Sequence, residues 1–211
     1  MRAEVEAKFL ADDPAVLDAL ATMPVLDFAG LGPARTVSES DRYLDTADGA
    51  LAARRWACRL RRRDGAFRVS LKGPAEATAE DWHHRRPEVE GPATHSLAPA
   101  DWPASDARGR LLELAGGAAL SERFELRQER TERPVIVDGH RVGTMSLDVA
   151  DVIERGHERG RLLVVELELA GEGSLSVDRF RDLASALAAR PGLRPDPRTK
   201  LEHALERLAA G

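Results

Sequence analysis

Charged side chains recur at every second residue in several short segments of this 211-residue chain. Residues two apart on a β-strand point to the same face, so each set predicts one charged strand face. Guanidinium and ammonium groups bind phosphate oxygens, and carboxylates bind hard divalent cations. The spacing and residue types are therefore typical of a site for a polyphosphate with magnesium or manganese. The sets are Glu4, Glu6 and Lys8; Arg59, Arg61 and Arg63; Arg68, Ser70 and Lys72; Arg86, Glu88 and Glu90; Arg130; and Glu166 with Glu168.

These faces have two interpretations. A half-buried strand normally turns its polar face to water, and solvated faces with salt bridges would explain the pattern without any ligand. If the strands close into a barrel with these faces inside, like charges meet, and two of them 4 Å apart cost roughly 4 kcal/mol at an effective dielectric constant of 20. On the second interpretation the interior must be wet and must bind something. Replacing Arg61 by alanine would then relieve repulsion and leave the stability unchanged or higher.

Alternating patterns and turn residues predict the strands that position these faces. Asp64-Gly65 and Asp138-Gly139 are typical of two-residue hairpin turns. Gly91-Pro92 is expected to end a strand, and the charge-rich segment 151–161 is expected to be a mobile solvated loop. The expected strands are 2–10, 35–45, 56–63, 66–72, 82–90, 122–131, 134–137, 142–149 and 161–169.

Helical spacing of apolar residues predicts a short helix after Asp13-Pro14, a turn at 50–54, a short helix at 107–114 and two C-terminal helices at about 176–190 and 197–209. Seven to nine antiparallel strands with a few inserted helices predict an α+β protein built on a closed or nearly closed sheet.

Composition excludes several classes of protein. A net charge of −5 is unlike that of a general nucleic-acid binder. The longest apolar run, Leu162 to Val165, is far shorter than the roughly 20 residues of a membrane helix. The N-terminus lacks the apolar core of a secretory signal, so we expect a cytoplasmic protein. The single cysteine, Cys58, excludes an internal disulfide, and the adjacent His83 and His84 point to opposite strand faces and cannot readily share a metal.

Seven motifs, in order along residues 4–200, resemble those of the CYTH superfamily, the triphosphate tunnel metalloenzymes. Glu4-Val5-Glu6-Ala7-Lys8 resembles its Glu-x-Glu-x-Lys signature. The three lysines of the chain, against 28 arginines, all fall in such motifs. The others are Tyr43-Leu44-Asp45-Thr46, Arg59-Leu60-Arg61, Leu71-Lys72-Gly73-Pro74, Arg86-Pro87-Glu88-Val89-Glu90, Ser146-Leu147-Asp148 with Glu166-Leu167-Glu168, and Arg198-Thr199-Lys200.

The resemblance implies a single domain over 1–211, an eight-stranded antiparallel closed β-barrel with peripheral helices. It implies catalytic roles for Glu4, Glu6 and Lys72. It also implies that one or two Mg²⁺ or Mn²⁺ ions are held by Glu4, Glu6, Asp148, Glu166 and Glu168. The phosphate-binding residues would be Lys8, Arg59, Arg61, Lys72, Arg86, Arg130 and Lys200.

One strand departs from the family pattern. The family usually presents a basic residue two positions before the arginine, whereas this sequence has Gln128 before Arg130. Either Arg127 takes over that role or one phosphate contact is missing.

The superfamily includes class IV adenylyl cyclases, thiamine triphosphatases, inorganic triphosphatases and, more distantly, fungal RNA triphosphatases. We therefore expect metal-dependent hydrolysis of the terminal phosphate of a small-molecule triphosphate, with inorganic triphosphate as the first candidate and nucleoside or thiamine triphosphate as alternatives. An adenylyl cyclase is the main rival enzyme, and a polyphosphate- or nucleotide-binding sensor is the non-enzymatic alternative. No nucleic acid or membrane partner is expected, and the protein would be a monomer or a homodimer.

Overall fold

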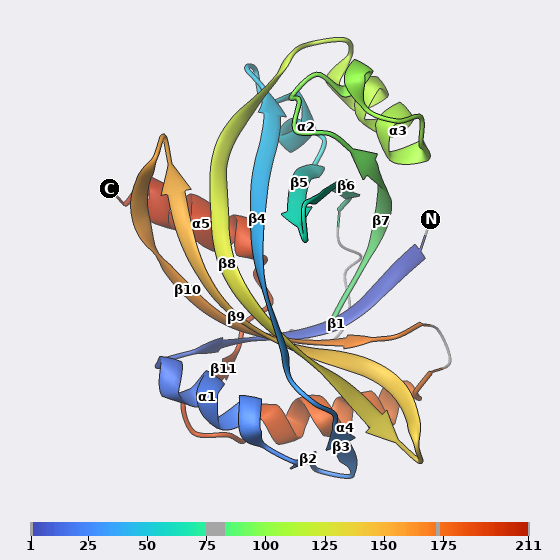
Figure 1. Cartoon of the computed structure of the whole chain (residues 1–211), viewed down its shortest axis with the longest axis vertical. Helices are drawn as coiled ribbons and strands as arrows, with labels where there is room; N and C mark the ends of the chain where they lie inside the picture. Colours follow the sequence, from blue (N-terminus) through green and yellow to red (C-terminus); the bar gives the residue numbers. More distant parts are fainter. Residues whose placement is uncertain (1, 75–82, 172–173, 211) are drawn as a thin grey trace.

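A computed structural model of the chain describes residues 2–74, 83–171 and 174–210. It describes the side chains of all these residues except 2–4 and 83–86. The chain forms one large antiparallel sheet with helices at its periphery (Figure 1). The predicted α+β class and the antiparallel sheet with peripheral helices are therefore confirmed.

Eight long strands make up most of the sheet, in the order β8-β4-β5-β6-β7-β1-β10-β9. β8 pairs with β9 as well as with β4, so each long strand has an antiparallel neighbour on both sides. Short strands β2 (Val25–Leu26), β3 (Ala29–Leu31) and β11 (Leu193–Pro195) add to this set, with β3 on β8 and β11 on β1. The long strands are β1 (Arg2–Ala11), β4 (Arg35–Thr46), β5 (Ala57–Arg63), β6 (Ala66–Lys72), β7 (His83–Ala93), β8 (Leu120–Val137), β9 (His140–Glu154) and β10 (His157–Leu169).

Tight turns connect consecutive strands where the sequence carries a turn dipeptide. Asp64-Gly65 joins β5 to β6 and Asp138-Gly139 joins β8 to β9, and all four residues have positive φ. Arg155-Gly156 has the same backbone signs, with φ of 49° and 82°, and joins β9 to β10. The expectation of a mobile loop over 151–161 is therefore wrong, because a third two-residue turn lets both strands extend through that segment.

Two predicted strand ends are also wrong. β7 continues through Gly91 and Pro92, which pair with β6. A Cβ atom on Gly91 would lie 2.4 Å from Ser105 Oγ, so glycine allows a neighbouring helix to approach the strand. β8 also continues through Pro134. The pairing of β8 with β4 ends at Glu132, so the missing N–H of Pro134 breaks no hydrogen bond to β4.

Helices cover the sheet in three places. α1 (Pro14–Thr22) and α4 (Val177–Ala188) contribute Leu17, Leu20, Phe180 and Leu183 to one buried apolar cluster. α2 (Ala50–Ala53), the 3-10 turn η1 (Pro99–Asp101) and α3 (Asp106–Ala115) belong to a second region. α5 (Lys200–Ala209) contributes to a third cluster. Among the described residues, no helix has both the length and the apolar character needed to span a membrane.

The apolar clusters determine which face of each strand remains for other uses. On β5, Cys58 and Leu60 are buried in the cluster that α3 covers. Residues of opposite parity on this strand, Arg59, Arg61 and Arg63, consequently point to the other side of the sheet. The hydrophobic effect thus directs the charged face of β5 to the inner side of the sheet, away from α3.

Candidate functional site

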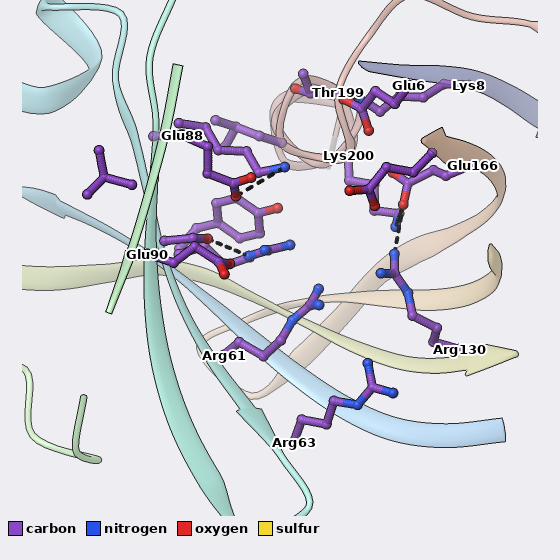
Figure 2. Close-up of a pocket in the computed structure, with 18 of the residues that line it drawn as sticks. Glu6, Lys8, Arg61, Arg63, Glu88, Glu90, Arg130, Glu166, Thr199 and Lys200 are labelled. Atoms are coloured by element: carbon purple, nitrogen blue, oxygen red, sulfur yellow. Dashed lines mark hydrogen bonds and ion pairs between the residues drawn. The ribbon is translucent and has the colours of Figure 1, made fainter. Parts of the chain in front are cut away.

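A charged cavity of about 590 Å³ lies on this inner side of the sheet (Figure 2). Its wall contains seven cationic and six acidic side chains, together with Tyr43, Ser70, Thr199 and a few apolar residues. The cations are Lys8, Arg59, Arg61, Arg63, Lys72, Arg130 and Lys200, and the acids are Glu6, Glu88, Glu90, Glu132, Glu166 and Glu168. The interpretation of the charged strand faces as solvated outer surfaces is therefore wrong for these residues.

Most of the residues predicted for the site line this cavity, and one lies directly behind its wall. Asp148 has no exposed surface and forms hydrogen bonds to two of the lining cations. The side chains of Glu4 and Arg86 lie outside the described part of the structure. Their backbones pair with each other across β1 and β7.

β1 and β10 bring together two acids and a lysine at one side of the cavity. Glu6 lies directly opposite Glu168, and Lys8 lies opposite Glu166. Side chains in such cross-strand positions have Cβ atoms about 5 Å apart. Lys8 Nζ donates a hydrogen bond of 2.5 Å to Glu6 Oε1, and each of these two side chains is 4% exposed. This pairing explains how two acidic residues face each other on adjacent strands.

Arg130 and Lys200 share two carboxylates from neighbouring strands. Arg130 donates to both oxygens of Asp148 at 2.7 and 2.8 Å and to Glu166 Oε2 at 2.7 Å. Lys200 Nζ donates to Asp148 at 2.5 Å and to Glu166 at 3.1 Å. Burial by itself would raise the pKa of Glu166, but the charges of Lys200 and Arg130 outweigh it and hold the pKa well below its usual value. Arg130 and Lys200 likewise outweigh the effect of burial and lower the pKa of Asp148, so both acids are ionised at neutral pH.

The segment that leads into α5 places Lys200 in this network. Asp196 donates its backbone N–H to the carbonyl of Lys8, and its carboxylate accepts hydrogen bonds from Arg198. Thr199 caps the helix through a capping box with Glu202. Lys200 is the first residue of the helix and extends into the cavity. In the Arg-Thr-Lys motif, the first residue anchors the segment, the second begins the helix and the third supplies the cation.

Two buried acids on β4 were not identified from the sequence. Arg61 forms a bidentate pair with Asp41, with both contacts at 2.7 Å, and lies 3.1 Å from Glu39. Arg59 lies 3.6 Å from Asp41. The side chains of Glu39 and Asp41 are 0% and 1% exposed, so they form an acidic layer beneath the arginines of β5.

This acidic layer overturns the expectation of unrelieved repulsion among the arginines. Burial would raise the pKa of Asp41, but Arg59 and Arg61 hold it at about 2, so the acid remains charged beside them. The sequence signal was present. Val37, Glu39, Asp41 and Tyr43 alternate along the segment that was predicted as a strand, with the two acids on the same face.

On β8, the strand that departs from the family pattern, Gln128 and Arg127 point to opposite faces. Gln128 is 3% exposed, and its Nε2 donates to Glu39 at 2.6 Å. Its Oε1 is buried and has no hydrogen-bond partner among the described residues. Arg127 lies on the opposite face of β8, where it pairs with Glu125 and is 59% exposed. Arg127 therefore does not take over the role of a cavity cation, whereas Arg130 does line the cavity.

Other residues that the sequence singled out serve the fold. Asp45 accepts hydrogen bonds from the backbone N–H groups of Thr46, Leu51 and Ala52, and so holds α2 against β4. Cys58 is fully buried, and burial together with the charge of Asp45 raises the pKa of its thiol. It is an inert core residue, as expected. His83 and His84 lie outside the described side chains.

The donor set at the Glu6–Glu168 side is suited to a hard divalent cation. Among the side chains that the structure describes, no three or more histidine, cysteine, aspartate or glutamate residues are grouped closely enough to hold a metal ion by themselves. Mg²⁺ at phosphate sites is usually bound by only one or two carboxylates, with phosphate oxygens and waters as the remaining ligands. The two carboxylates of Glu6 and Glu168, opposite each other on adjacent strands, fit this requirement. Both Asp148 and Glu6 already have cationic partners, since Asp148 pairs with Arg130 and Lys200 and Glu6 pairs with Lys8.

Comparison with known proteins finds both a family and similar folds. The family model described as "CYTH domain" matches residues 2–204. A search of curated protein sequences gives no match.

Similar folds occur among solved structures. A candidate adenylyl cyclase from Hippeastrum, described as having a dominant triphosphatase activity, superposes with a TM-score of 0.71 at 19% identity, over 96% of this chain and 95% of that one. A candidate adenylate cyclase from Bacillus halodurans superposes with a TM-score of 0.60 at 18% identity, over 96% and 98%. At these identities the likeness shows the fold.

Proposed function

Because this chain belongs to the CYTH domain family, we propose that it is a divalent-metal-dependent triphosphatase that removes the terminal phosphate of a small triphosphate, with inorganic triphosphate as the first substrate to test. The observation that carries the proposal is a cavity in which seven cations converge with the Glu6–Glu168 carboxylate pair. Cations of this kind bind phosphate oxygens, and the carboxylates suit a hard metal ion.

We also propose that the eight long strands act as a closed tunnel. Each has a paired neighbour on both sides, and β8 pairs with β9 over residues that include Arg130 and Asp148. A closed wall would exclude bulk water from the charges inside and so strengthen their effect on a bound anion.

The charge balance of the cavity explains why a metal ion would accompany the substrate. The six lining acids and the buried Glu39, Asp41 and Asp148 outnumber the seven lining cations among the described side chains. A bare polyanion would therefore enter a region with no net positive charge. A bound divalent cation would supply positive charge at the Glu6–Glu168 side and polarise the phosphoryl oxygens.

The residues of the chain would divide the reaction between them. Lys8, Lys72 and Lys200, which all line the cavity, would hold the phosphate oxygens. Arg130, fixed by Asp148 and Glu166, would stabilise the charge that develops on the equatorial and leaving oxygens. Glu6 would orient a water molecule, whose oxygen forms a bond to the terminal phosphorus as the bridging P–O bond breaks. The products would be orthophosphate and pyrophosphate.

Product analysis distinguishes this proposal from its alternatives. The protein is incubated with inorganic triphosphate or ATP, with Mg²⁺ or Mn²⁺, and orthophosphate, pyrophosphate and cyclic AMP are measured. The proposal expects orthophosphate and pyrophosphate from triphosphate. Cyclic AMP and pyrophosphate from ATP would instead identify a cyclase. Binding without any product would indicate a sensor.

A matched pair of variants tests the site. E168Q removes one charge from the Glu6–Glu168 pair, and we expect turnover to fall at least a hundredfold, which corresponds to about 2.7 kcal/mol of transition-state stabilisation. E122Q removes an acid that pairs with Arg42 outside the cavity and should leave turnover unchanged. Near-normal turnover in E168Q would remove Glu168 from the metal site.

A melting experiment on the native protein tests binding separately. With Ca²⁺ in place of Mg²⁺, triphosphate should raise the melting temperature by several degrees and orthophosphate much less.

A further inference from the structure

On the inner face of β8, the side chain next to Arg130 is an acid. Glu132 follows Arg130 by two residues on the same strand face and lines the same cavity. Its carboxylate forms a bidentate pair with Arg63, with both contacts at 2.7 Å. The side chains of Glu132 and Arg63 are each 25% exposed, so the pair lies at the border between the cavity and solvent.

Carboxylates already surround Arg63. Besides the two contacts with Glu132, it donates to Glu39 at 3.0 Å and lies 4.0 Å from Asp64. Burial of Arg63 would lower its pKa, but the hydrogen bond to Glu132 has the larger effect and raises it. Arg61 and Arg63 each have a bidentate carboxylate partner and a contact with Glu39. They differ in where that partner lies, because Glu132 itself lines the cavity, whereas Asp41 is buried beneath the arginines.

The two ends of the cavity are not equivalent. Arg63 lies at the edge of the lining residues opposite Thr199 (Figure 2). At the Thr199 end, Leu201 of α5 lines the cavity and packs with Ala204 in the third apolar cluster. A chain of phosphates that is bound near Lys200 and Arg130 and extends away from this end would reach Arg63. Arg63 lies two residues beyond Arg61, about 6.6 Å further along β5.

We propose that Glu132 is a specificity-determining residue that limits the length of the phosphate chain, because it neutralises Arg63 and presents a carboxylate to any phosphoryl group that extends beyond Arg61. The proposal rests on the proposed function. The cavity then accepts triphosphate and rejects longer linear polyphosphates. A merely structural ion pair would affect stability without distinguishing one chain length from another.

The test measures the dissociation constants of linear triphosphate and tetraphosphate by calorimetry with Ca²⁺. The quantity compared is the ratio of the tetraphosphate constant to the triphosphate constant. In the native protein, tetraphosphate should bind at least tenfold more weakly than triphosphate. In E132Q the ratio should fall to threefold or less, because the repulsive charge is removed. E122Q, which alters an Arg–Glu pair outside the cavity, should keep the native ratio. A double variant, R63M/E132M, replaces the whole pair by apolar side chains in case E132Q does not fold.

Each outcome bears on one of the two proposals. Equal affinity for both chain lengths in the native protein, or an unchanged ratio in both E132Q and R63M/E132M, overturns the role of Glu132. A lowered ratio in either variant supports it. If the native protein binds neither compound, the proposed function itself fails.

Discussion

Replacing Arg61 by alanine should strongly destabilise the protein, although Arg61 is itself surrounded by other cations. The substitution removes the bidentate partner of Asp41 and a contact 3.1 Å from Glu39. Both acids have side chains at most 1% exposed, and Asp41 is left with a 3.6 Å contact to Arg59 and a 3.3 Å hydrogen bond from Gln128. Water cannot readily replace the lost guanidinium at such buried positions.

The magnitude follows from two estimates. Removing one partner of a buried ion pair typically costs about 3 to 5 kcal/mol. The lowering of the pKa of Asp41 from 3.8 to about 2, in which Arg59 and Arg61 outweigh the effect of burial, corresponds to about 2 kcal/mol of stability at neutral pH. For a domain of this size each kcal/mol moves the melting temperature by about 2 to 4 °C. We therefore expect R61A to melt about 4 to 20 °C below the native protein at pH 7.

The effect should depend on pH in a specified direction. The native pKa of Asp41 is lower than the unfolded value, so the stabilisation is fully present above pH 4 and is lost as the pH falls toward 2. The difference in melting temperature between R61A and the native protein should therefore shrink over that range.

Scanning calorimetry at several pH values, without ligand, measures both effects. R35A removes an arginine whose pair with Asp64 is exposed at 64% and 62%, and it should shift the melting temperature by no more than about 4 °C. R61K, which retains a cation beside Asp41, should fall between R61A and the native protein. An R61A melting temperature equal to or above the native value at pH 7 would refute this reasoning and restore the expectation of relieved repulsion.

Two further substitutions test the buried polar groups. Q128E replaces the amide that donates to Glu39 with a third acid, so urea unfolding at pH 7 should show a free energy of unfolding lower by about 2 kcal/mol or more. This loss should decrease toward pH 4, because burial raises the pKa of the new carboxyl and it becomes protonated there. E129Q, on the opposite strand face, should have little effect, and a loss in Q128E that is independent of pH would contradict the argument. D196N weakens the hydrogen bonds that Asp196 accepts from Arg198 and so the placement of Lys200. Because those hydrogen bonds outweigh burial and lower the pKa of Asp196 to about 2, the free energy of unfolding of the variant should fall by about 1 to 3 kcal/mol at pH 7 and by less below pH 4. Unchanged calorimetric stability together with unchanged triphosphate affinity would exclude this role of Asp196.

Local patterns in the sequence determined most of the strands and several of their turns. Alternation predicted the shared face of Arg59, Arg61 and Arg63, because side-chain direction has a period of two in any strand. Asp64-Gly65 and Asp138-Gly139 were sufficient for their turns, because few residues adopt positive φ at both positions. Extended strands were missed at Gly91 and Pro134, where the backbone conformation depends on a neighbouring helix or on the end of a strand pairing.

The motifs also located most of the residues that line the cavity, but not the partners of those residues. Arg63 pairs with Glu132, 69 residues later, and Lys200 pairs with Asp148, 52 residues earlier. Neither separation leaves a periodic signal in the sequence. Such partners depend on which strands become neighbours and in which register they pair.

Period two establishes that certain residues share a face but does not establish whether that face points inward. That was decided by tertiary structure, because apolar residues of the opposite parity, such as Leu60, are buried beneath helices outside the sheet. The same packing brings Glu39 and Asp41 beneath the arginines of β5, so that a set of like charges in the sequence becomes a network of ion pairs. The charges and their spacing follow from the amino-acid sequence alone, whereas their neutralisation required the pairing of β4 with β5, since the energy of a charge depends on its neighbours in space.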